Sequence, residues 1–347
     1  MRDRKRPGVL VVSLDFELHW GVRDRWSVGD QRTRLLGARE AVPAMLELFE
    51  AFGIHATWAI VGFLFFEGKR ELLDALPSRR PAYVDPALSP YAGLAAIGAS
   101  ERDDPFHFAP SLIRQIAHTP DQEIGTHTLS HYYCLEPGQG PADFREDVHA
   151  AMEVTRSKLG RAPRSIVFPR NQYSAAYLDA CRELGLVAYR GNLDAWAYRA
   201  RGAAAESQVR RAVRLADAYL PITGTSSHAR PPAEPGPVNV PASRFLRPYT
   251  PALRHLEPLL LHRIEADLRT AARRGRLFHL WWHPHDFGLH LRENLAVLRR
   301  VLTTFARLRD TYGMESRSMA EAVPCVAGSR EPSRRQGERA AAASSSA

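Results

Sequence analysis

The chain has 347 residues, of which 45% are hydrophobic and 24% charged, as is ordinary for a soluble globular protein. Its net charge of +9 suggests nucleic-acid binding, but residues 1–7 carry +3 (four basic, one acidic) and residues 328–347 carry +2 (four arginines, two glutamates). Only +4 remains for the long stretch between them, which excludes the broad basic surface of a nucleic-acid-binding protein.

Short apolar runs alternate along the chain with segments of helical periodicity. We expect strands at 8–14, 54–61, 122–125, 165–168, 186–190, 277–282 and near 313–316. We expect helices at 35–52, 141–159, 174–184, 204–219, 256–274 and 291–309, with short helices and loops in 67–121 and an ordered loop in 221–251. The alternation predicts a parallel sheet, closed or wound, with helices outside. A single domain is expected over 8–326, between a disordered basic start (1–7) and a disordered tail (327–347).

The cysteines and the apolar runs indicate in which cellular compartment the protein is expected. Cys134, Cys181 and Cys325 are far apart and form no Cys-x-x-Cys motif, which argues against a disulfide framework and favours a reducing compartment. The apolar run 9–12 is too short for a signal peptide, and no run approaches the length of a transmembrane span. We therefore expect a cytoplasmic protein, and we expect Cys134 to be a small core residue.

Polar side chains capable of chemistry follow the carboxyl ends of five predicted strands. In a (β/α) barrel this end of the sheet carries the active site, and five such groups at equivalent ends are hard to explain as scattered surface polarity. We expect them to converge. They are Asp15 and Glu17, His127 and His131, Arg170, Asp194, and His283.

Two of these pairs have informative spacing. Asp15 and Glu17 share one face of an extended chain, and two acids at the end of a buried strand must be solvated, bridged by a cation, or catalytic. His127 and His131 are four residues apart, so on a helical turn both imidazoles would lie on one face, within reach of one divalent metal. Spacing of this kind is common by chance, and two half-buried, hydrogen-bonded histidines are the alternative.

The stretch Glu123-Ile-Gly-Thr-His-Thr-Leu-Ser-His-Tyr-Tyr-Cys134, the strand-end motifs and their order resemble the polysaccharide deacetylase family (NodB homology domain, carbohydrate esterase family four) over about residues 8–323. The resemblance implies a distorted (β/α) barrel, here with about seven parallel strands and helices outside. It also implies a divalent metal, most often Zn²⁺, and hydrolysis of an N-acetyl group on an amino sugar.

The resemblance assigns a proton acceptor and a metal site. Asp15 matches the family's aspartate base, and Glu17, His127 and His131 match its metal ligands. The family usually has a second Asp directly after the first, whereas Glu17 stands two positions further on. A second departure is Gln172, where the family has Pro.

Other positions follow from the same resemblance. Arg170 is expected to orient the base, the backbone N–H of Tyr173 to face the oxyanion, and His283 to act as the general acid. His285 and Asp286 stand beside His283. One of them is expected to fix the tautomer of His283, and the alternative is that they face solvent.

Substrate contacts are expected from residues that match the family loosely or that carry an aromatic face. A sugar ring can stack on tryptophan, although tryptophans in or beside buried strands more often pack in the core. The candidates are Trp20, Asp194, Trp196 and Trp282, with Trp281 beside the last of them.

Together, these features predict a metal-dependent hydrolase that removes an N-acyl group, N-acetyl above all, from an amino sugar in a cytoplasmic glycan precursor or saccharide. The alternatives are a C–N hydrolase of a small metabolite that is not a sugar, and a glycan-binding pseudo-enzyme without turnover. The sequence does not define the oligomeric state.

Overall fold

The computed structural model describes residues 6–324. The expected disordered tail (327–347), Cys325 and residues 1–5 of the expected disordered start lie outside the described residues. No helix in the described range combines the length and the apolar character needed to cross a bilayer.

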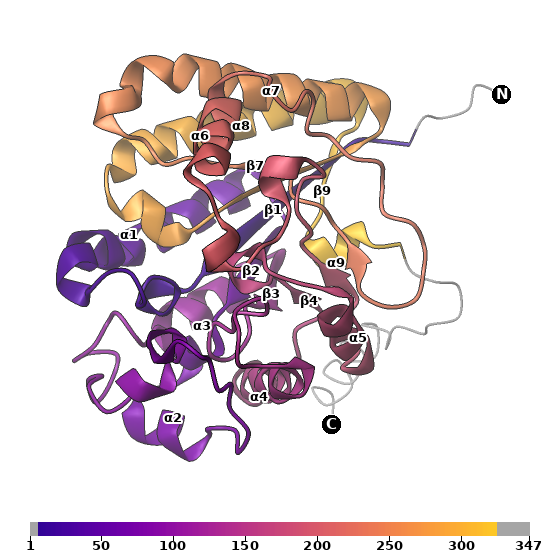
Figure 1. Cartoon of the computed structure of the whole chain (residues 1–347). Coiled ribbons are helices and arrows are strands. Elements are labelled where there is room, and N and C mark those ends of the chain that lie inside the picture. Colours follow the sequence, from indigo (N-terminus) through magenta and orange to yellow (C-terminus); the bar gives the residue numbers. More distant parts are fainter. Residues whose placement is uncertain (1–5, 325–347) are drawn as a thin grey trace, which may run out of the picture.

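One curled sheet forms the centre of the molecule, and every pairing between its strands is parallel (Figure 1). Eight strands lie in the order β6-β5-β4-β3-β2-β1-β8-β7, and β9 also pairs with β1. The arrangement confirms the expected distorted (β/α) barrel, with more strands than the seven predicted. The strands are β1 (Val9–Phe16), β2 (Ala56–Ile60), β3 (Gln122–Thr126), β4 (Ser165–Ile166), β5 (Ala188–Tyr189), β6 (Val238–Asn239), β7 (Arg244–Phe245), β8 (Leu277–Trp282) and β9 (Glu315–Ser316).

The additional strands β6 and β7 lie in the segment 221–251, which was predicted to be loop. At two residues each they are too short for any periodicity to be detected. The chain between them links the two ends of the sheet, because the Ala242 N–H donates to the Gly191 carbonyl after β5 and the Ser243 N–H donates to the His279 carbonyl in β8, both at 2.8 Å. The segment therefore curls the sheet toward closure.

Helices surround the sheet in the order in which they contact one another, with α6, α7, α8, α1 and α3 packed in sequence and α4 beside α5 (Figure 1). The short α9 contacts β1 and β5. The helices are α1 (Val28–Phe52), α2 (Lys69–Asp74), α3 (Pro110–His118), α4 (Pro141–Leu159), α5 (Ala175–Glu183), α6 (Gln208–Tyr219), α7 (Glu257–Arg274), α8 (Leu291–Tyr312) and α9 (Met319–Ala322).

α1 begins seven residues before the helix predicted at 35–52. Its start is fixed by a capping box, in which the Asp30 N–H donates to the Ser27 hydroxyl at 3.2 Å and the Ser27 N–H donates to the Asp30 carboxylate at 3.0 Å. The first turns are largely polar, so hydrophobic periodicity did not reveal them.

β1 shows how the sheet separates its core from its site. All eight of its residues are buried, as predicted, and the four even-numbered side chains pack in the large cluster that includes residues of α1, α7 and α8. Val9 and Val11 pack instead with residues of other strands. Ser13 and Asp15, on the same face as these valines, bond to Arg190, the residue after β5. The inner face therefore changes from apolar to polar toward the carboxyl end of the strand.

Candidate active site

Asp15, at the end of β1, is held by a buried arginine. The Arg190 guanidinium donates to both Asp15 carboxylate oxygens at 2.7 Å, to the Ser13 hydroxyl at 3.0 Å and to the Asn171 side-chain oxygen at 3.0 Å. Burial disfavours the charged carboxylate, but the charge and hydrogen bonds of Arg190, together with the neighbouring histidines, outweigh this cost and lower the pKa of Asp15. Asp15 is therefore ionised and fixed in orientation by a two-pronged contact.

This arginine is not the one predicted. Arg170 was expected to orient Asp15, but its guanidinium forms an ion pair with Asp24 and lies over the Tyr133 ring, 4.1 Å from the centroid. The reason is local: Arg170 stands in a short 3-10 turn with φ of 54°, beyond the end of β4. Arg190 directly follows β5, and its side chain points to the inner face.

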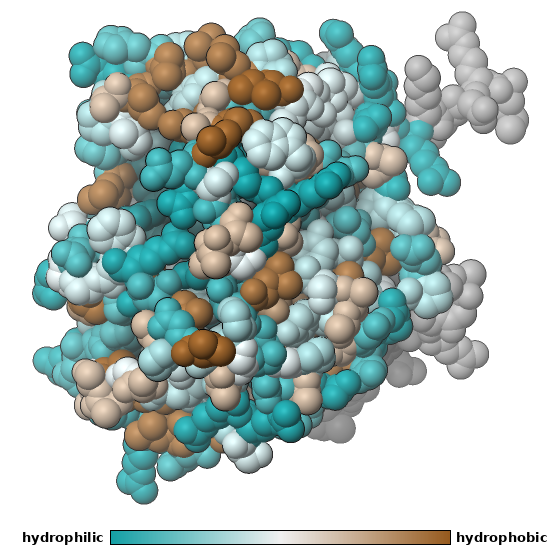
Figure 2. Space-filling view, viewed as in Figure 1, coloured by the Kyte–Doolittle hydropathy of each residue, from teal (hydrophilic) through white to brown (hydrophobic). Residues whose placement is uncertain are grey.

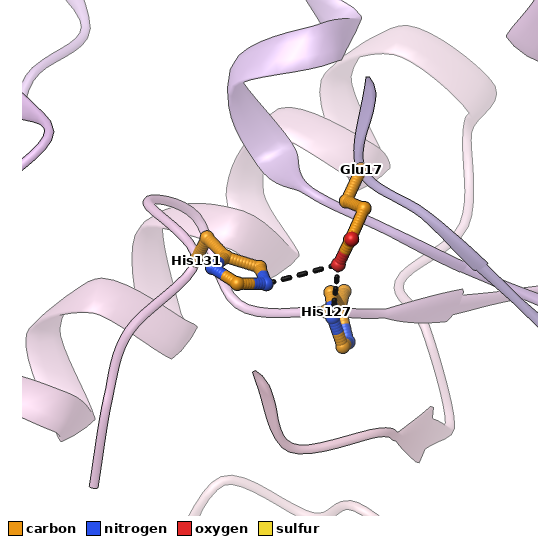
Figure 3. Close-up of side chains that lie close together, drawn as sticks. All are labelled: Glu17, His127 and His131. Atoms are coloured by element: carbon orange, nitrogen blue, oxygen red, sulfur yellow. Dashed lines mark hydrogen bonds and ion pairs between the residues drawn. The ribbon is translucent and has the colours of Figure 1, made fainter. Parts of the chain in front are cut away.

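Glu17 lies just beyond β1 and reaches both predicted histidine ligands (Figure 3). Its Oε2 is 3.0 Å from His131 Nε2 and 3.3 Å from His127 Nε2, and all three residues are buried. Gly21 makes room for this carboxylate, because a Cβ on Gly21 would lie 2.0 Å from Glu17 Cδ. The two-residue spacing of Asp15 and Glu17 therefore still delivers both acids to one place.

The two histidines converge without the predicted helical turn. The segment after β3 is irregular, and Thr128 and His131 adopt left-handed backbone conformations with φ of 64° and 59°. Asp147 of α4 holds this loop by accepting from the Leu129 N–H at 2.7 Å and from the Ser130 hydroxyl. A buried carboxylate and two strained residues, and not helical periodicity, thus bring the imidazoles together.

The donor chemistry of this cluster fits a cation. The His127 Nδ1–H donates to the Val167 carbonyl at 2.7 Å, so a neutral His127 turns the lone pair of Nε2 toward Glu17. Burial lowers the pKa of His131 to about 4, which keeps its imidazole neutral near pH 7. A lone pair facing a carboxylate oxygen is repulsive unless a cation lies between them. Glu17, His127 and His131 could therefore hold a divalent metal ion.

His283 follows β8 and borders both acids. Its Nε2 is 3.7 Å from Glu17 Oε1 and 3.9 Å from Asp15 Oδ2, while its Nδ1 is 3.1 Å from Asp286 Oδ2. Asp286 and His285 are buried, so the solvent-facing alternative for these two residues is wrong. Asp286 also pairs with Arg34, which supplies a cation to that carboxylate. An Asp286 acceptor at Nδ1 directs the second ring nitrogen toward the site.

A cavity of about 300 Å³ adjoins this cluster through His283. Arg170, Asn171, Asn192, Trp281 and His283 form the part of its wall next to the cluster. Groups capable of metal binding, proton acceptance and proton donation therefore meet at the edge of a space that can receive a ligand.

Several predicted substrate contacts do not reach this cavity. Trp20 and Trp282 are buried: the Trp20 indole N–H donates to the His107 carbonyl at 2.9 Å, and the Trp282 indole N–H points to Met45 Sδ at 3.3 Å. Strand alternation explains the second case, because Trp281 faces the interior and its neighbour Trp282 faces α1. Trp281, named in the sequence beside Trp282, is the tryptophan that lines the cavity.

Asp194 and Trp196 are exposed, and neither lines the cavity. Asn192, two residues earlier, takes that place, and its side-chain amide donates to the Asn171 carbonyl at 3.1 Å. The Tyr173 ring packs against Phe168 and Tyr189. An oxyanion contact by its backbone N–H stays a prediction.

Sequence reasoning missed the layer that supports Asp15. Ser13 bonds to Arg190 and also to the buried His279, whose Nε2 lies 2.8 Å from the Ser13 hydroxyl oxygen. The sequence did contain a signal: Ser13 and Asp15 are polar residues at alternate positions of an apolar strand, and the polar His279 lies inside another apolar strand, which His283 follows. Arg190 likewise ends an apolar run, but it was overlooked because the family motif assigned its role to Arg170.

Comparisons with known proteins bear on the family and the fold. Residues 35–189 match the family described as polysaccharide deacetylase. The fold is similar to the crystal structure of a candidate polysaccharide deacetylase from Mycobacterium smegmatis, with a TM-score of 0.56 and 15% identity over 95% of this chain and 96% of that one. No curated protein matches the chain significantly.

Two further solved structures are more distant. One is the chitin deacetylase of the fungal pathogen Colletotrichum lindemuthianum, with a TM-score of 0.47 and 13% identity over 93% of this chain and 90% of that one. The other is a carbohydrate esterase family four pseudoenzyme from Bacillus anthracis, with a TM-score of 0.43 and 10% identity over 93% and 67%.

Proposed function

Because residues 35–189 match the polysaccharide deacetylase family and the fold is similar to that of a candidate deacetylase, we propose that this chain is a metal-dependent hydrolase that removes an N-acyl group, N-acetyl in the simplest case, from an amino sugar. One observation carries the proposal. Side chains from three separated parts of the sequence, at residues 15–17, 127–131 and 283, meet within 4 Å of a neighbour at one edge of the sheet.

Glu17, His127 and His131 would hold the metal, and two imidazoles with one carboxylate form a ligand set typical of catalytic zinc. A divalent cation in this place supplies Lewis acidity, which polarises an amide carbonyl and makes water more acidic. Val167 fixes the tautomer of His127, and Gly21 leaves the space that the Glu17 carboxylate fills.

The protein's own groups would move the protons. Asp15 accepts the proton of the attacking water, and Arg190 keeps the carboxylate ionised and aimed. His283 donates a proton to the departing amine, which is a poor leaving group until it is protonated. Asp286 at Nδ1 directs Nε2 of His283 toward the substrate. The side chain of His283 is 25% exposed, so it can exchange protons with solvent between turnovers.

We also propose that the substrate is a cytoplasmic glycan precursor or saccharide. In support, Cys134 and Cys181 are buried as free thiols, which suits a reducing compartment. Cys134 packs in a core cluster with Phe144 and Tyr177, as expected.

The pseudo-enzyme alternative rested on two departures from the family pattern. Glu17 reaches both histidines despite its position, and Gln172 has a structural place, where its side chain donates to Glu136 at 2.8 Å and accepts from the Leu135 N–H at 3.1 Å. Neither departure removes a group that the reaction needs, so turnover is the better supported proposal.

Metal analysis together with acetate release from acetylated amino sugars tests the proposal. We expect about one zinc per chain and turnover that a chelator abolishes and zinc restores. Tightly bound zinc without hydrolysis of any acetylated amino sugar would favour the binding protein. Release of acetate or ammonia from small amides that are not sugars would favour the other alternative.

A further inference from the structure

The cavity beside His283 has a strongly basic wall. Six arginines line it, whereas Glu206 is the only acidic residue that does so among the described residues. The arginines are Arg170, Arg199, Arg201, Arg214, Arg244 and Arg247.

Three of these guanidinium groups are paired within the protein. Arg214 contacts Glu206 at 3.1 Å, Arg170 pairs with Asp24, and Arg244 contacts Asp267 at 2.6 Å. Salt bridges of this kind fix the side chains and cancel their charge locally, so these arginines define the shape of the wall.

The other three arginines are not paired. Arg199, Arg201 and Arg247 have no ion pair or side-chain hydrogen bond within residues 6–324, and Arg247 is half-buried. Burial lowers the pKa of Arg247 by more than the nearby Tyr219 and Tyr198 raise it. A guanidinium withdrawn from water without a counter-charge is costly, so a missing anion would relieve it.

Arg244 gives a second, independent indication. Its side chain is only 4% exposed, yet its buried Nη2 has no hydrogen-bond partner, although its Nε and Nη1 bond to Asp267 and to the Asp217 carbonyl. Nη1 of Arg170, on the same cavity wall, also lacks a hydrogen-bond partner. Other arginines, among them Arg39 and Arg263, also have a buried nitrogen without a partner, but those of Arg170 and Arg244 belong to residues that line the cavity, where a ligand atom or a water can supply the acceptor.

We propose that the amino-sugar substrate carries a phosphate group, which this arginine-lined cavity binds while the acylated nitrogen lies at His283. The proposal rests on the proposed function and names its substrate class. Phosphate offers several charged oxygen acceptors, and guanidinium groups bind them through paired N–H donors. Trp281 lines the same cavity, where its ring can contact the sugar.

Paired probes test this inference in the zinc-loaded, full-length protein. N-acetylglucosamine 1-phosphate and uridine diphosphate N-acetylglucosamine should bind at least about tenfold more tightly than N-acetylglucosamine, measured by calorimetry, because charge-assisted hydrogen bonds form only with the first two. The kcat/KM for acetate release should favour the phosphorylated sugars in the same direction.

Arg247→Gln should reduce the preference for the phosphorylated probe about tenfold, and Arg199→Gln should reduce it less, because Arg199 is exposed and its charge is more screened. The matched control is Arg211→Gln on α6, which removes the same charge from an exposed position outside the cavity and should leave the preference unchanged. An equal loss in Arg211→Gln would overturn the proposal, since the effect would then be one of net charge.

The two proposals fail in different ways. Acetate release with equal kcat/KM for neutral and phosphorylated sugars would overturn the phosphate site and leave the deacetylase intact. Phosphate-dependent binding that requires Arg247, without release of acetate from any probe, would support the site and overturn the proposed reaction.

Discussion

The two sides of the curled sheet differ in how completely their charged side chains are paired within the protein. Around β1 and β3, nearly every charged group has a partner within the protein: Arg190 holds Asp15, Glu17 meets two histidines, and Asp286 meets His283. Along the cavity wall, Arg247 has no acceptor among the described residues, and Arg244 of β7 and Arg170 each keep one buried nitrogen without a hydrogen-bond partner. Hydrophilic residues form a band across the middle of the face that carries α6 (Figure 2). The first side is organised before any substrate arrives, as catalysis requires, whereas the second is completed only by a ligand.

Removing a metal ligand should have the largest effect on the paired side. His131→Ala should abolish zinc binding and reduce acetate release by about a thousandfold or more, because the reaction loses its Lewis acid. Zinc content by mass spectrometry and turnover should fall together. His149→Ala, on the exposed face of α4, is the control and should change neither. Full zinc occupancy in His131→Ala would remove this residue from the metal site.

The proton acceptor can be removed without the metal. Asp15→Asn should retain zinc and lose about 10²- to 10⁴-fold in kcat, because the amide keeps the shape but cannot take up the proton. Zinc content and kcat on the same sample separate the two effects. Unimpaired turnover with zinc in place would show that another group is the base.

Gly21→Ala tests whether the position of the Glu17 carboxyl group matters for metal binding. The new Cβ would occupy the space of the Glu17 carboxyl group, whose flexible side chain can move aside, so the fold should survive while zinc affinity falls about 10- to 100-fold. Zinc competition with a chelator measures this, and circular dichroism checks the fold. Gly93→Ala, where a Cβ meets nothing within 4 Å, should bind zinc normally. Wild-type zinc affinity in Gly21→Ala would mean that Glu17 does not need this position.

The smallest effect concerns the support of the histidine loop. Burial raises the pKa of Asp147 to about 6, so the folded state keeps a proton that the unfolded chain has already lost. The contribution of this carboxyl group is therefore fully present only below the unfolded pKa of 3.8, and it is lost as the pH rises through about 6.

Urea unfolding of the zinc-free protein at pH 4.5 and pH 7, in wild type and Asp147→Asn, isolates this contribution. The stability difference between wild type and variant should fall by roughly 1–3 kcal/mol over this range. A difference that stays constant with pH would show that Asp147 is ionised throughout.

Much of the fold and of the catalytic side could be predicted from the sequence. Buried strands are continuous apolar runs, and chemistry follows at their ends, so Asp15, Glu17, His127, His131 and His283 were all placed at one edge of the sheet. The spacing of His127 and His131 did not predict how the two imidazoles come together. His131 adopts a left-handed backbone conformation, in a loop that is held by Asp147 of α4. Two-residue strands such as β7 carry no pattern at all.

The binding side was predicted poorly for a physical reason. Trp282 and Trp281 are neighbours with opposite orientations, and Arg190 and Arg170 differ in whether they follow a strand directly or lie in a turn. Such differences of one position decide which side chain faces the cavity, and composition cannot resolve them. Trp20 was assigned to the substrate by its aromatic ring, and Asp194 and Trp196 by a loose match to the family, yet none of them lines the cavity.

The most direct test of the central claim is a crystal structure of the zinc-loaded protein with anomalous data at the zinc edge. The account predicts one peak per chain, about 2.0–2.2 Å from Glu17 and from Nε2 of His127 and His131, with Asp15 and His283 on either side. A peak on His283, His285 and Asp286 instead, or no peak from protein that releases acetate, would contradict it.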